Sequence, residues 1–207
     1  KKYNIYVILY MSEKLNQLPT DDLFLLDRFI NGNDDAFTII YNRYVNQLMA
    51  YGMGWGFDKE TLKDAIQDVF YKLYFNRKAF QGVSNPKFYL IRALKNRILD
   101  IQKSNMDTTD LTGLEFSVRP TVLDELIAEE ERNKIEKQIE LYLNLLTGRQ
   151  REAVYLRFIE EMEYEEIAII LEMSAPAVRK LVCRAIARIR TEELSLVMLL
   201  CISRMIN

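Results

Sequence analysis

The sequence predicts an all-α protein of two small helical domains joined by a flexible linker, the second domain containing a helix-turn-helix. Apolar residues recur at helical spacing almost everywhere in the 207-residue chain, and no alternating apolar run is bounded by turn dipeptides. Only seven Gly and four Pro interrupt these patterns. The periodicity fades between residues 20–104 and residues 122–193, so we expect each stretch to fold as a domain of its own.

The first domain, residues 20–104, is expected to begin with two helices. The first covers residues 21–30 and ends at the turn signal Asn31-Gly32-Asn33. The second presents one apolar face until three glycines interrupt it. That face carries Phe37, Ile40, Tyr41, Tyr44, Leu48 and Tyr51, and the glycines are Gly52, Gly54 and Gly56.

The third and fourth helices of this domain have clear starting signals. Asp58 is the expected N-cap of the third helix, and a loop over residues 76–85 follows that helix. Pro86 suits the first turn of the fourth helix, with Ser84 or Asn85 as its cap. The core stripe expected on the fourth helix is Ile91, Leu94, Ile98 and Ile101.

The composition of residues 105–121 is typical of a flexible linker. The segment is rich in Asp, Thr, Gly and Ser and contains Pro120. The second domain, residues 122–193, is expected to open with a long charged amphipathic helix over residues 122–146. Three shorter helices follow over residues 149–158, 164–171 and 174–193, and an apolar tail covers residues 194–207.

Residues 164–185 have the pattern of a helix-turn-helix. A short helix turns its apolar residues inward, and a tight turn follows it. Ser174 caps the second helix, which the small Ala168 allows to cross the first closely. Glu172 occupies a turn position that is commonly glycine in such motifs. The residues of the second helix that face the first are Val178, Val182, Ala185 and Ile189.

The opposite side of that second helix is basic. Such a helix suits the major groove of DNA, with its N-terminal residues at base edges and its later arginines on phosphates. The residues expected to contact DNA are Ser174, Ala177, Arg179, Lys180, Arg184 and Arg188. The alternative is an amphipathic helical hairpin that carries a basic outer face without any role in DNA binding.

The overall charge argues against a protein that coats nucleic acid by bulk charge. The formal net charge is -2 and the isoelectric point is about 5.5. Basic residues instead gather locally, over residues 87–103 and 176–190. Two separate basic surfaces are therefore expected on a nearly neutral protein.

The composition also excludes several classes of site. With no His and only Cys183 and Cys201, the usual metal-ligand and Cys-His catalytic arrangements are impossible. We therefore expect no metal, no cofactor and no small-molecule substrate, and the reduced cysteines fit a cytoplasmic setting. The apolar runs are too short to span a bilayer. We expect Met11 to be the natural start, which leaves residues 1–10 outside the fold.

Five segments in a fixed order resemble parts of one known family. The first three are residues 34–44 (DDAFTIIYNRY), 63–74 (KDAIQDVFYKLY) and 88–100 (FYLIRALKNRILD). The last two are residues 146–158 (LTGRQREAVYLRF) and 160–168 (EEMEYEEIA). The first group resembles region 2, and the second region 4, of extracytoplasmic-function (ECF) sigma factors of RNA polymerase.

The resemblance implies that the third helix binds the clamp-helix coiled coil of the polymerase largest subunit. The residues that match the family's motif there are Asp64, Gln67, Asp68 and Phe70. Tyr71 shares a polar, acidic face with three of them, at i, i+3, i+4 and i+7 spacing, and such a face suits a basic helical partner. An ordinary solvated helix face is the alternative.

The resemblance likewise implies that the fourth helix and the loop before it read the melted -10 element, with an extruded base held by the loop. The residues expected to contact this strand are Phe80, Arg92, Lys95 and Asn96. Basic groups beside aromatic rings supply phosphate neutralisation and a surface for an unstacked base. The alternative is that Phe80, Phe88 and Tyr89 belong to the core.

These observations lead to the hypothesis of a sigma factor rather than an enzyme. Core RNA polymerase would bind the Asp64 face, the first domain would hold the -10 strand, and the second would grip the -35 duplex. Two alternatives remain: a helix-turn-helix regulator that does not replace sigma, and a helical interaction protein that does not touch DNA. The apolar tail over residues 194–207 departs from the usual end of the family, and it either extends the last helix over the first domain or docks an anti-sigma factor.

Overall fold

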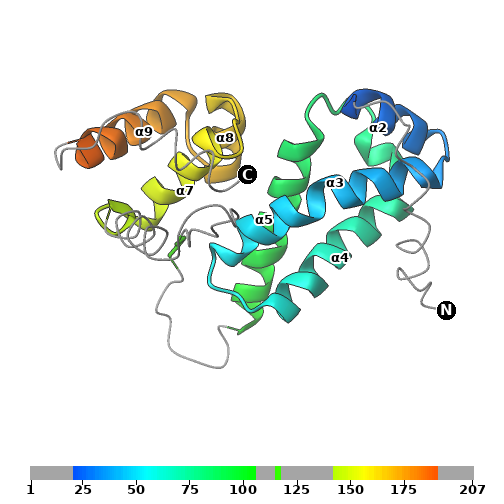
Figure 1. Ribbon diagram of the computed structural model, residues 1–207, viewed down its shortest axis with the longest axis horizontal. Helices are drawn as coiled ribbons and strands as arrows, with labels where there is room; N and C mark the ends of the chain where they lie inside the picture. The colour runs from blue at the N-terminus through cyan, green and yellow to red at the C-terminus, as the bar shows by residue number, and fades with distance from the viewer. Residues whose placement is uncertain (1–20, 106–114, 118–141, 191–207) are drawn as a thin grey trace, which may run out of the picture. The chain divides into compact units, whose positions relative to one another are not determined.

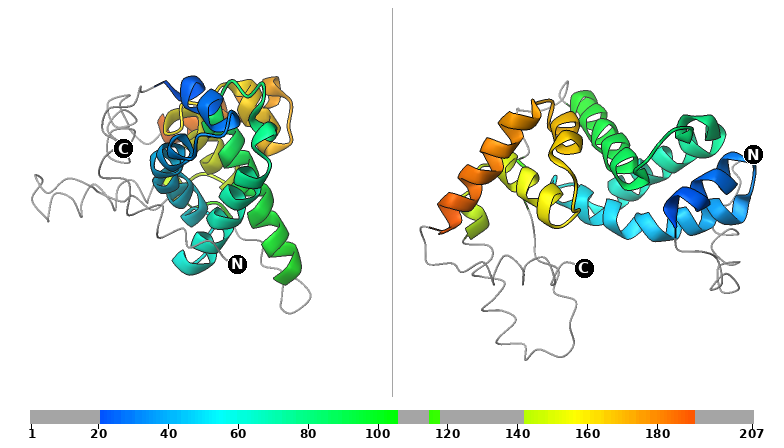
Figure 2. Two further views of the ribbon diagram at one scale, coloured as in Figure 1. Left: turned by 90° about the vertical axis from the view of Figure 1, so that its right-hand side faces the viewer. Right: turned by 90° about the horizontal axis from the view of Figure 1, so that it is seen from above.

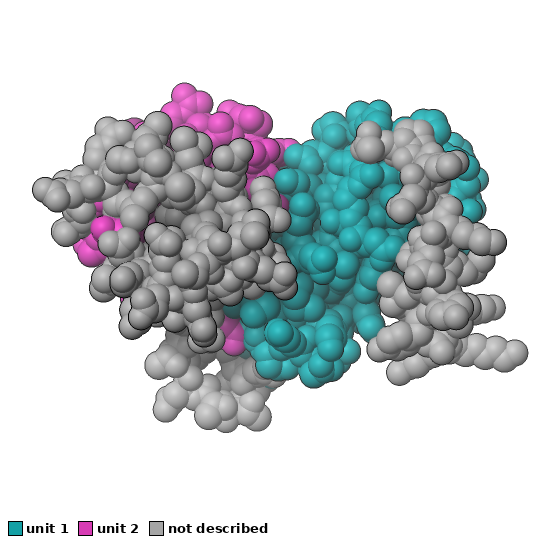
Figure 3. All heavy atoms as spheres, in the orientation of Figure 1, with its two compact units in different colours: residues 1–53, 57–110 teal, residues 54–56, 111–207 magenta. Residues whose placement is uncertain are grey.

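The computed structural model describes residues 21–105, 115–117 and 142–190. Within these residues every regular element is a helix, which confirms the predicted all-α class. The chain divides into two compact units (Figure 3), the first made of residues 1–53 and 57–110 and the second of residues 54–56 and 111–207. None of the helices in the described segments combines the length and the apolar character needed to cross a membrane.

The first unit contains the four helices that the sequence predicts, together with one short 3-10 helix. The elements in chain order (Figure 1) are α2 (Asp22–Ile30), α3 (Asp34–Met53), α4 (Lys59–Phe75), η2 (Arg77–Phe80) and α5 (Pro86–Asn105). Helices α4 and α5 each pack against α3 and against one another.

Side-chain caps set where α4 and α5 begin. The Asp58 carboxylate accepts hydrogen bonds from the backbone N–H groups of Glu60 and Thr61, at 3.0 and 2.9 Å, as expected for an N-cap. The hydroxyl of Thr61 also donates to this carboxylate, and these bonds hold the pKa of Asp58 below its usual value. At α5 the cap is Asn85, whose side-chain oxygen accepts from the N–H of Phe88 at 3.1 Å.

One predicted boundary is wrong. Gly52 does not interrupt the second helix, because α3 continues through it to Met53. A Cβ atom at Gly52 would lie 2.6 Å from Leu62 Cδ2, so the glycine is what allows α3 to approach α4 this closely. The interruption comes at residues 54–56, where Gly56 has a positive φ of 78°.

An aromatic cluster fills the core of the first unit. The Phe37 ring centroid lies 5.1 Å from that of Phe29, 6.0 Å from that of Phe70 and 5.0 Å from that of Tyr74. Tilted and edge-to-face rings at these separations stabilise a core beyond the effect of burial alone. Phe80 at the end of η2 joins the cluster, 6.1 Å from Phe29, so part of the predicted loop over residues 76–85 is fixed to the core.

An acidic residue fastens α2 to α3. Figure 2 shows α2 alongside the first half of α3, and the Asp22 carboxylate accepts hydrogen bonds from the Arg43 guanidinium and the Tyr44 hydroxyl in the middle of α3. Burial, reinforced by this bond to Asp22, raises the pKa of Tyr44. The tyrosine therefore stays neutral and keeps its donor role.

The second unit contains α7 (Gly148–Phe158), α8 (Tyr164–Leu171) and α9 (Ala175–Arg190), which pack on one another (Figure 1). Thr147 starts α7 with a capping box, since its hydroxyl accepts from the Gln150 N–H and the Gln150 side chain accepts from the Thr147 N–H. The predicted helix over residues 122–146 lies largely outside the described residues, and the tail over residues 194–207 lies entirely outside them.

Polar groups of α7 are paired inside the second unit. The buried hydroxyl of Tyr155 donates to the Glu160 carboxylate at 3.1 Å. Burial first, and then the negative charge of Glu160, raise the pKa of Tyr155. This hydrogen bond offsets the cost of placing a carboxylate where only 4% of the Glu160 residue is exposed.

The described part of the predicted linker, residues 115–117, is attached to the second unit through one buried residue. Phe116 is buried in the second unit, with its ring centroid 5.8 Å from that of Trp55 and 5.5 Å from that of Tyr155. The neighbouring Glu115 forms an ion pair of 2.9 Å with Arg151 of α7. The composition of residues 105–121 predicts flexibility, but Phe116 gives the segment an apolar anchor.

The turn between α8 and α9 forces a non-glycine residue into a left-handed conformation. Glu172 ends α8 with φ 52° and ψ 50°. The N–H of Met173 then donates to the Ala168 carbonyl at 2.9 Å, and the Arg149 guanidinium donates to the Leu171 carbonyl at 2.7 Å. These bonds satisfy the carbonyls at the end of α8 and set the start of α9.

We expect the substitution Glu172→Gly to raise the free energy of unfolding by about 0.5–1 kcal/mol, because glycine adopts this backbone conformation without the steric cost of a Cβ atom. Glu165→Gly is the matched control, since Glu165 is exposed on α8 with a helical backbone. That control should lower the free energy of unfolding by about 1 kcal/mol. Urea denaturation followed by circular dichroism measures both, and the same sign for both variants would contradict this description of the turn.

Candidate functional site

Helix α9 separates its apolar and basic residues onto opposite sides. Val178, Val182 and Ala185 are buried in the second unit, where α9 packs on α7 and α8. The exposed residues of the other side, called here the α9 basic face, are Arg179, Lys180, Arg184 and Arg188. Among the described residues, no carboxylate pairs with the first three of these cations. Their charge is therefore available to an external anion.

The N-terminus of α9 adds neutral groups to this surface. Ser174 is exposed, and its hydroxyl accepts a hydrogen bond of 3.4 Å from the backbone N–H of Ala177. A helix N-terminus carries free N–H groups and the positive end of the helix dipole, which favours phosphate. The six residues predicted to contact DNA on this helix thus lie on its exposed side or at its N-terminus.

The outward side of α4 combines acidic and aromatic residues. Asp64 is exposed, and Gln67 and Asp68 are half-buried. Tyr71 and Phe75 are 60% and 66% exposed, and their ring centroids lie 4.5 Å apart. These five residues follow i, i+3, i+4, i+7 and i+11 spacing and are called here the α4 face.

Two phenylalanines of α4 lie differently from what the sequence predicts. Phe70, predicted to contact polymerase, is buried with its ring 6.0 Å from that of Phe37 and 4.7 Å from that of Tyr41, so it supports α4 from within. Phe75 was not predicted, although it is exposed. Continuing the helical spacing by one more turn beyond Tyr71 would have found it.

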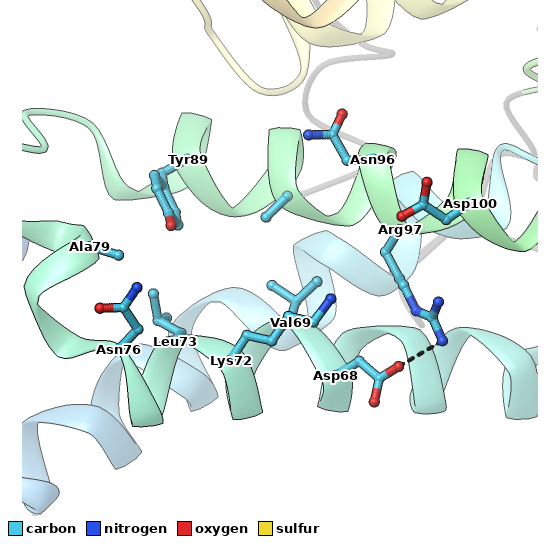
Figure 4. A pocket seen from close by; sticks show the side chains of 11 residues that line it. Asp68, Val69, Lys72, Leu73, Asn76, Ala79, Tyr89, Asn96, Arg97 and Asp100 are labelled. Atoms are coloured by element: carbon cyan, nitrogen blue, oxygen red, sulfur yellow. Dashed lines mark ion pairs between the residues drawn. The ribbon is translucent and has the colours of Figure 1, made fainter.

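A groove with a volume of about 190 Å³ lies between α4 and α5 (Figure 4). Lys72 and Leu73 of α4 line one wall, and Tyr89, Ala93 and Asn96 of α5 line the other. The groove therefore offers apolar walls together with amide, ammonium and phenol groups. It can accept a flat ring, since a cavity of about 150 Å³ is enough to hold benzene.

An ion pair joins the two walls at one end of this groove. The Arg97 guanidinium of α5 lies 2.8 Å from the Asp68 carboxylate of α4, as the dashed line in Figure 4 marks. Asp68 thus belongs both to the α4 face and to the groove lining. A partner that engages Asp68 from outside would compete with Arg97.

The four residues predicted to contact the -10 strand are not all brought together. Asn96 lines the groove and Arg92 is exposed on α5. Lys95 is only 9% exposed and Phe80 is in the core, so neither presents its side chain as expected. Tyr89, which the sequence leaves open between strand contact and core, lines the groove.

Two family models match the chain over most of these elements. The model for Sigma-70 region 2 matches residues 40–106, and the model for Sigma-70 region 4 matches residues 136–189. The ECF RNA polymerase sigma factor SigM of Bacillus subtilis is 22% identical over 160 residues, covering 73% of this chain and 91% of SigM. The RNA polymerase sigma-H factor of Pseudomonas aeruginosa is 25% identical over 173 residues, covering 79% of this chain and 89% of that protein. The chain belongs to the ECF sigma factors.

Two solved structures have the same fold. CnrH, solved in complex with the cytosolic domain of CnrY, gives a TM-score of 0.56 at 20% identity, with 82% of this chain and 95% of that chain covered. The sigma factor RpoE, solved in complex with the anti-sigma factor NepR from Bartonella quintana, gives a TM-score of 0.53 at 22% identity, with 73% and 92% covered. At these identities the likeness concerns the fold alone.

The protein is thus an RNA polymerase sigma factor for promoter-specific transcription initiation, as the sequence predicts. The region 2 match includes the α4 face and the groove beside it, and the region 4 match includes nearly all of α7, α8 and α9. Both regions occur in one chain, which favours a sigma factor over a regulator that carries only a helix-turn-helix module. The described surfaces therefore fall in the two regions that define the family.

Proposed function

We propose that this sigma factor uses three surfaces: the α4 face for core RNA polymerase, the α4–α5 groove for the -10 strand, and the α9 basic face for the -35 duplex. The division of α9 into a buried apolar side and an exposed basic side carries the proposal. This function requires no covalent chemistry of the protein. The proposed place of action is the cytoplasm. Each surface supports one part of the proposal separately.

The α9 basic face suits duplex DNA because its cations project from one side of a single rigid helix. A helix laid in the major groove places its N-terminal residues at base edges, which here are Ser174 and Ala177. The later residues Lys180 and Arg184 then lie toward phosphate oxygens. Their lack of carboxylate partners among the described residues leaves their charge free for this contact.

The α4–α5 groove suits an unstacked base because it pairs an aromatic ring with hydrogen-bonding groups. Tyr89 gives a surface on which a base can stack, and Asn76 at the end of α4, whose amide lies on the groove side in Figure 4, gives both a donor and an acceptor for a base edge. Arg92, exposed on the same helix, is available for the phosphates of the strand. Phe80 supports this arrangement from the core, with its ring 4.9 Å from that of Tyr89.

The α4 face suits a helical partner that carries both basic and apolar side chains. Asp64 is exposed, and it supplies the negative charge without serving another ion pair in the described structure. Tyr71 and Phe75 add an exposed aromatic end to the same face. Exposed aromatic residues beside charged ones are typical of protein–protein contact surfaces.

An anti-sigma factor is proposed as a further partner. RpoE of Bartonella quintana, which shares the fold, was solved with the anti-sigma factor NepR, and this supports the proposal. The apolar tail over residues 194–207 remains a candidate docking segment, although it lies outside the described residues.

The -35 assignment predicts that Arg184→Ala weakens duplex binding and makes it less dependent on salt. Losing one phosphate contact should lower the slope of log affinity against log salt concentration by about 0.9. Fluorescence anisotropy measures this with the full-length chain and a duplex that the chain itself enriches from a random-sequence pool. Lys63→Ala removes the same charge from α4 and should leave the slope unchanged. If the wild type, Arg184→Ala and Lys63→Ala all gave the same slope of log affinity against log salt concentration, the -35 assignment would be refuted.

The groove assignment predicts that Ala93→Phe blocks strand opening. A phenyl group at this wall would occupy the space meant for a base, so the yield of opened promoter complex should fall at least about tenfold. Permanganate reactivity of thymines in complexes with core polymerase reports the opening, and affinity for core polymerase should stay the same. Ala50→Phe, at an exposed position of α3, is the control. Normal opening by the Ala93 variant would remove the groove from the mechanism.

The polymerase assignment predicts that Asp64→Lys weakens core binding at least roughly tenfold while leaving the fold intact, because Asp64 is exposed. Asp68 is a poorer choice, since a lysine there would face Arg97. Titration of labelled sigma factor with core polymerase measures the affinity, and Asp27→Lys on the exposed side of α2 makes the same change of charge as a control. Core binding unaffected by Asp64→Lys would count against the α4 face.

A further inference from the structure

Tyr164, the first residue of α8, contacts guanidinium groups from both neighbouring helices. The Cζ atom of Arg157 in α7 lies 4.9 Å from the centroid of its ring, and the Cζ atom of Arg179 in α9 lies 5.0 Å from it. All three residues belong to the second unit. A half-buried tyrosine thus joins a helix of the scaffold to the helix that carries the basic face.

The two cations differ in how their charge is compensated. Arg157 donates a hydrogen bond of 2.6 Å to the Met162 carbonyl and lies 3.5 Å from the Glu163 carboxylate. Arg179 is exposed and pairs with no carboxylate among the described residues. Arg157 is therefore held in a local network, whereas Arg179 is restrained by its contact with the ring of Tyr164.

Stacking on a neutral ring restrains an arginine without neutralising it. A carboxylate would also hold the guanidinium, but it would cancel the charge and compete with phosphate for the same N–H groups. A ring attracts a guanidinium without using its N–H groups as a carboxylate does, so those groups remain able to donate to phosphate. An arginine that is already ordered loses less conformational entropy when it binds.

We propose that Tyr164 is a positioning residue that orders Arg179 for contact with DNA. The inference rests on the proposed contact between α9 and duplex DNA, and it adds a residue outside the recognition helix to that function. The phenol hydroxyl takes no part, because the ring alone makes the contact. Tyr164 acts through Arg179, so its effect on binding disappears when Arg179 is absent.

A double-mutant cycle on the full-length chain tests this role. The proteins are the wild type, Tyr164→Leu, Arg179→Ala and the double variant, with Tyr164→Phe as the conservative variant. The probe is the duplex enriched by the wild-type chain from a random-sequence pool, and fluorescence anisotropy gives the dissociation constants. Thermal unfolding of every variant shows whether the second unit remains folded.

Tyr164→Leu is expected to weaken binding about threefold to fivefold in the wild-type background and not to change it in the Arg179→Ala background. Tyr164→Phe is expected to bind like the wild type. An equal loss in both backgrounds, or no loss in either, would overturn the positioning role. If the wild type enriches no duplex, or if Arg179→Ala, Lys180→Ala and Arg184→Ala all bind as the wild type does, the -35 assignment itself fails.

Discussion

The burial of the apolar side of α9 is the constraint on which the α9 basic face depends. Each fully buried side chain of the kind found at Val178 and Val182 stabilises the fold by about 1.5–3 kcal/mol relative to leaving it exposed. Because the basic residues occupy the opposite side of the same helix, burying the apolar side fixes the direction in which the cations point. The turn at Glu172 and the hydrogen bond from Arg149 to Leu171 then set how α9 leaves α8.

Helix α4 meets a similar constraint but must serve two surfaces at once. Its buried side holds Phe70 in the aromatic cluster, its outward side forms the α4 face, and the edge between them forms one wall of the groove. The ion pair between Asp68 and Arg97 lies where these two surfaces meet. Polymerase bound to the α4 face and a strand bound in the groove would therefore both contact the Asp68–Arg97 ion pair. Through this pair, the binding of polymerase could change the binding of the strand.

Local signals in the sequence were enough to predict the helices of the described residues and the exposed basic side of α9. Asp58 and Asn85 cap their helices because a cap depends on three or four neighbouring residues. Gly52 was misread because its role comes from Leu62 of another helix, and no local pattern records that contact. Phe80 was placed in the DNA site for the same reason, since its burial depends on the distant Phe29. The burial of Phe116 could not be predicted from composition either, because its partners Trp55 and Tyr155 lie far away in the chain.

The protein carries a local basic surface despite its near-neutral net charge because of where its acidic groups are placed. Several arginines of the described residues have carboxylate partners, among them Arg77 with Asp34 and Arg97 with Asp68. The cations Arg179, Lys180 and Arg184 have none within that part of the chain. A sigma factor with a large net positive charge would bind any DNA, whereas compensation elsewhere confines the attraction to local basic surfaces such as the α9 basic face. Specific positioning of these cations then matters more than their number, and a neutral ring such as that of Tyr164 can order an arginine without removing its charge.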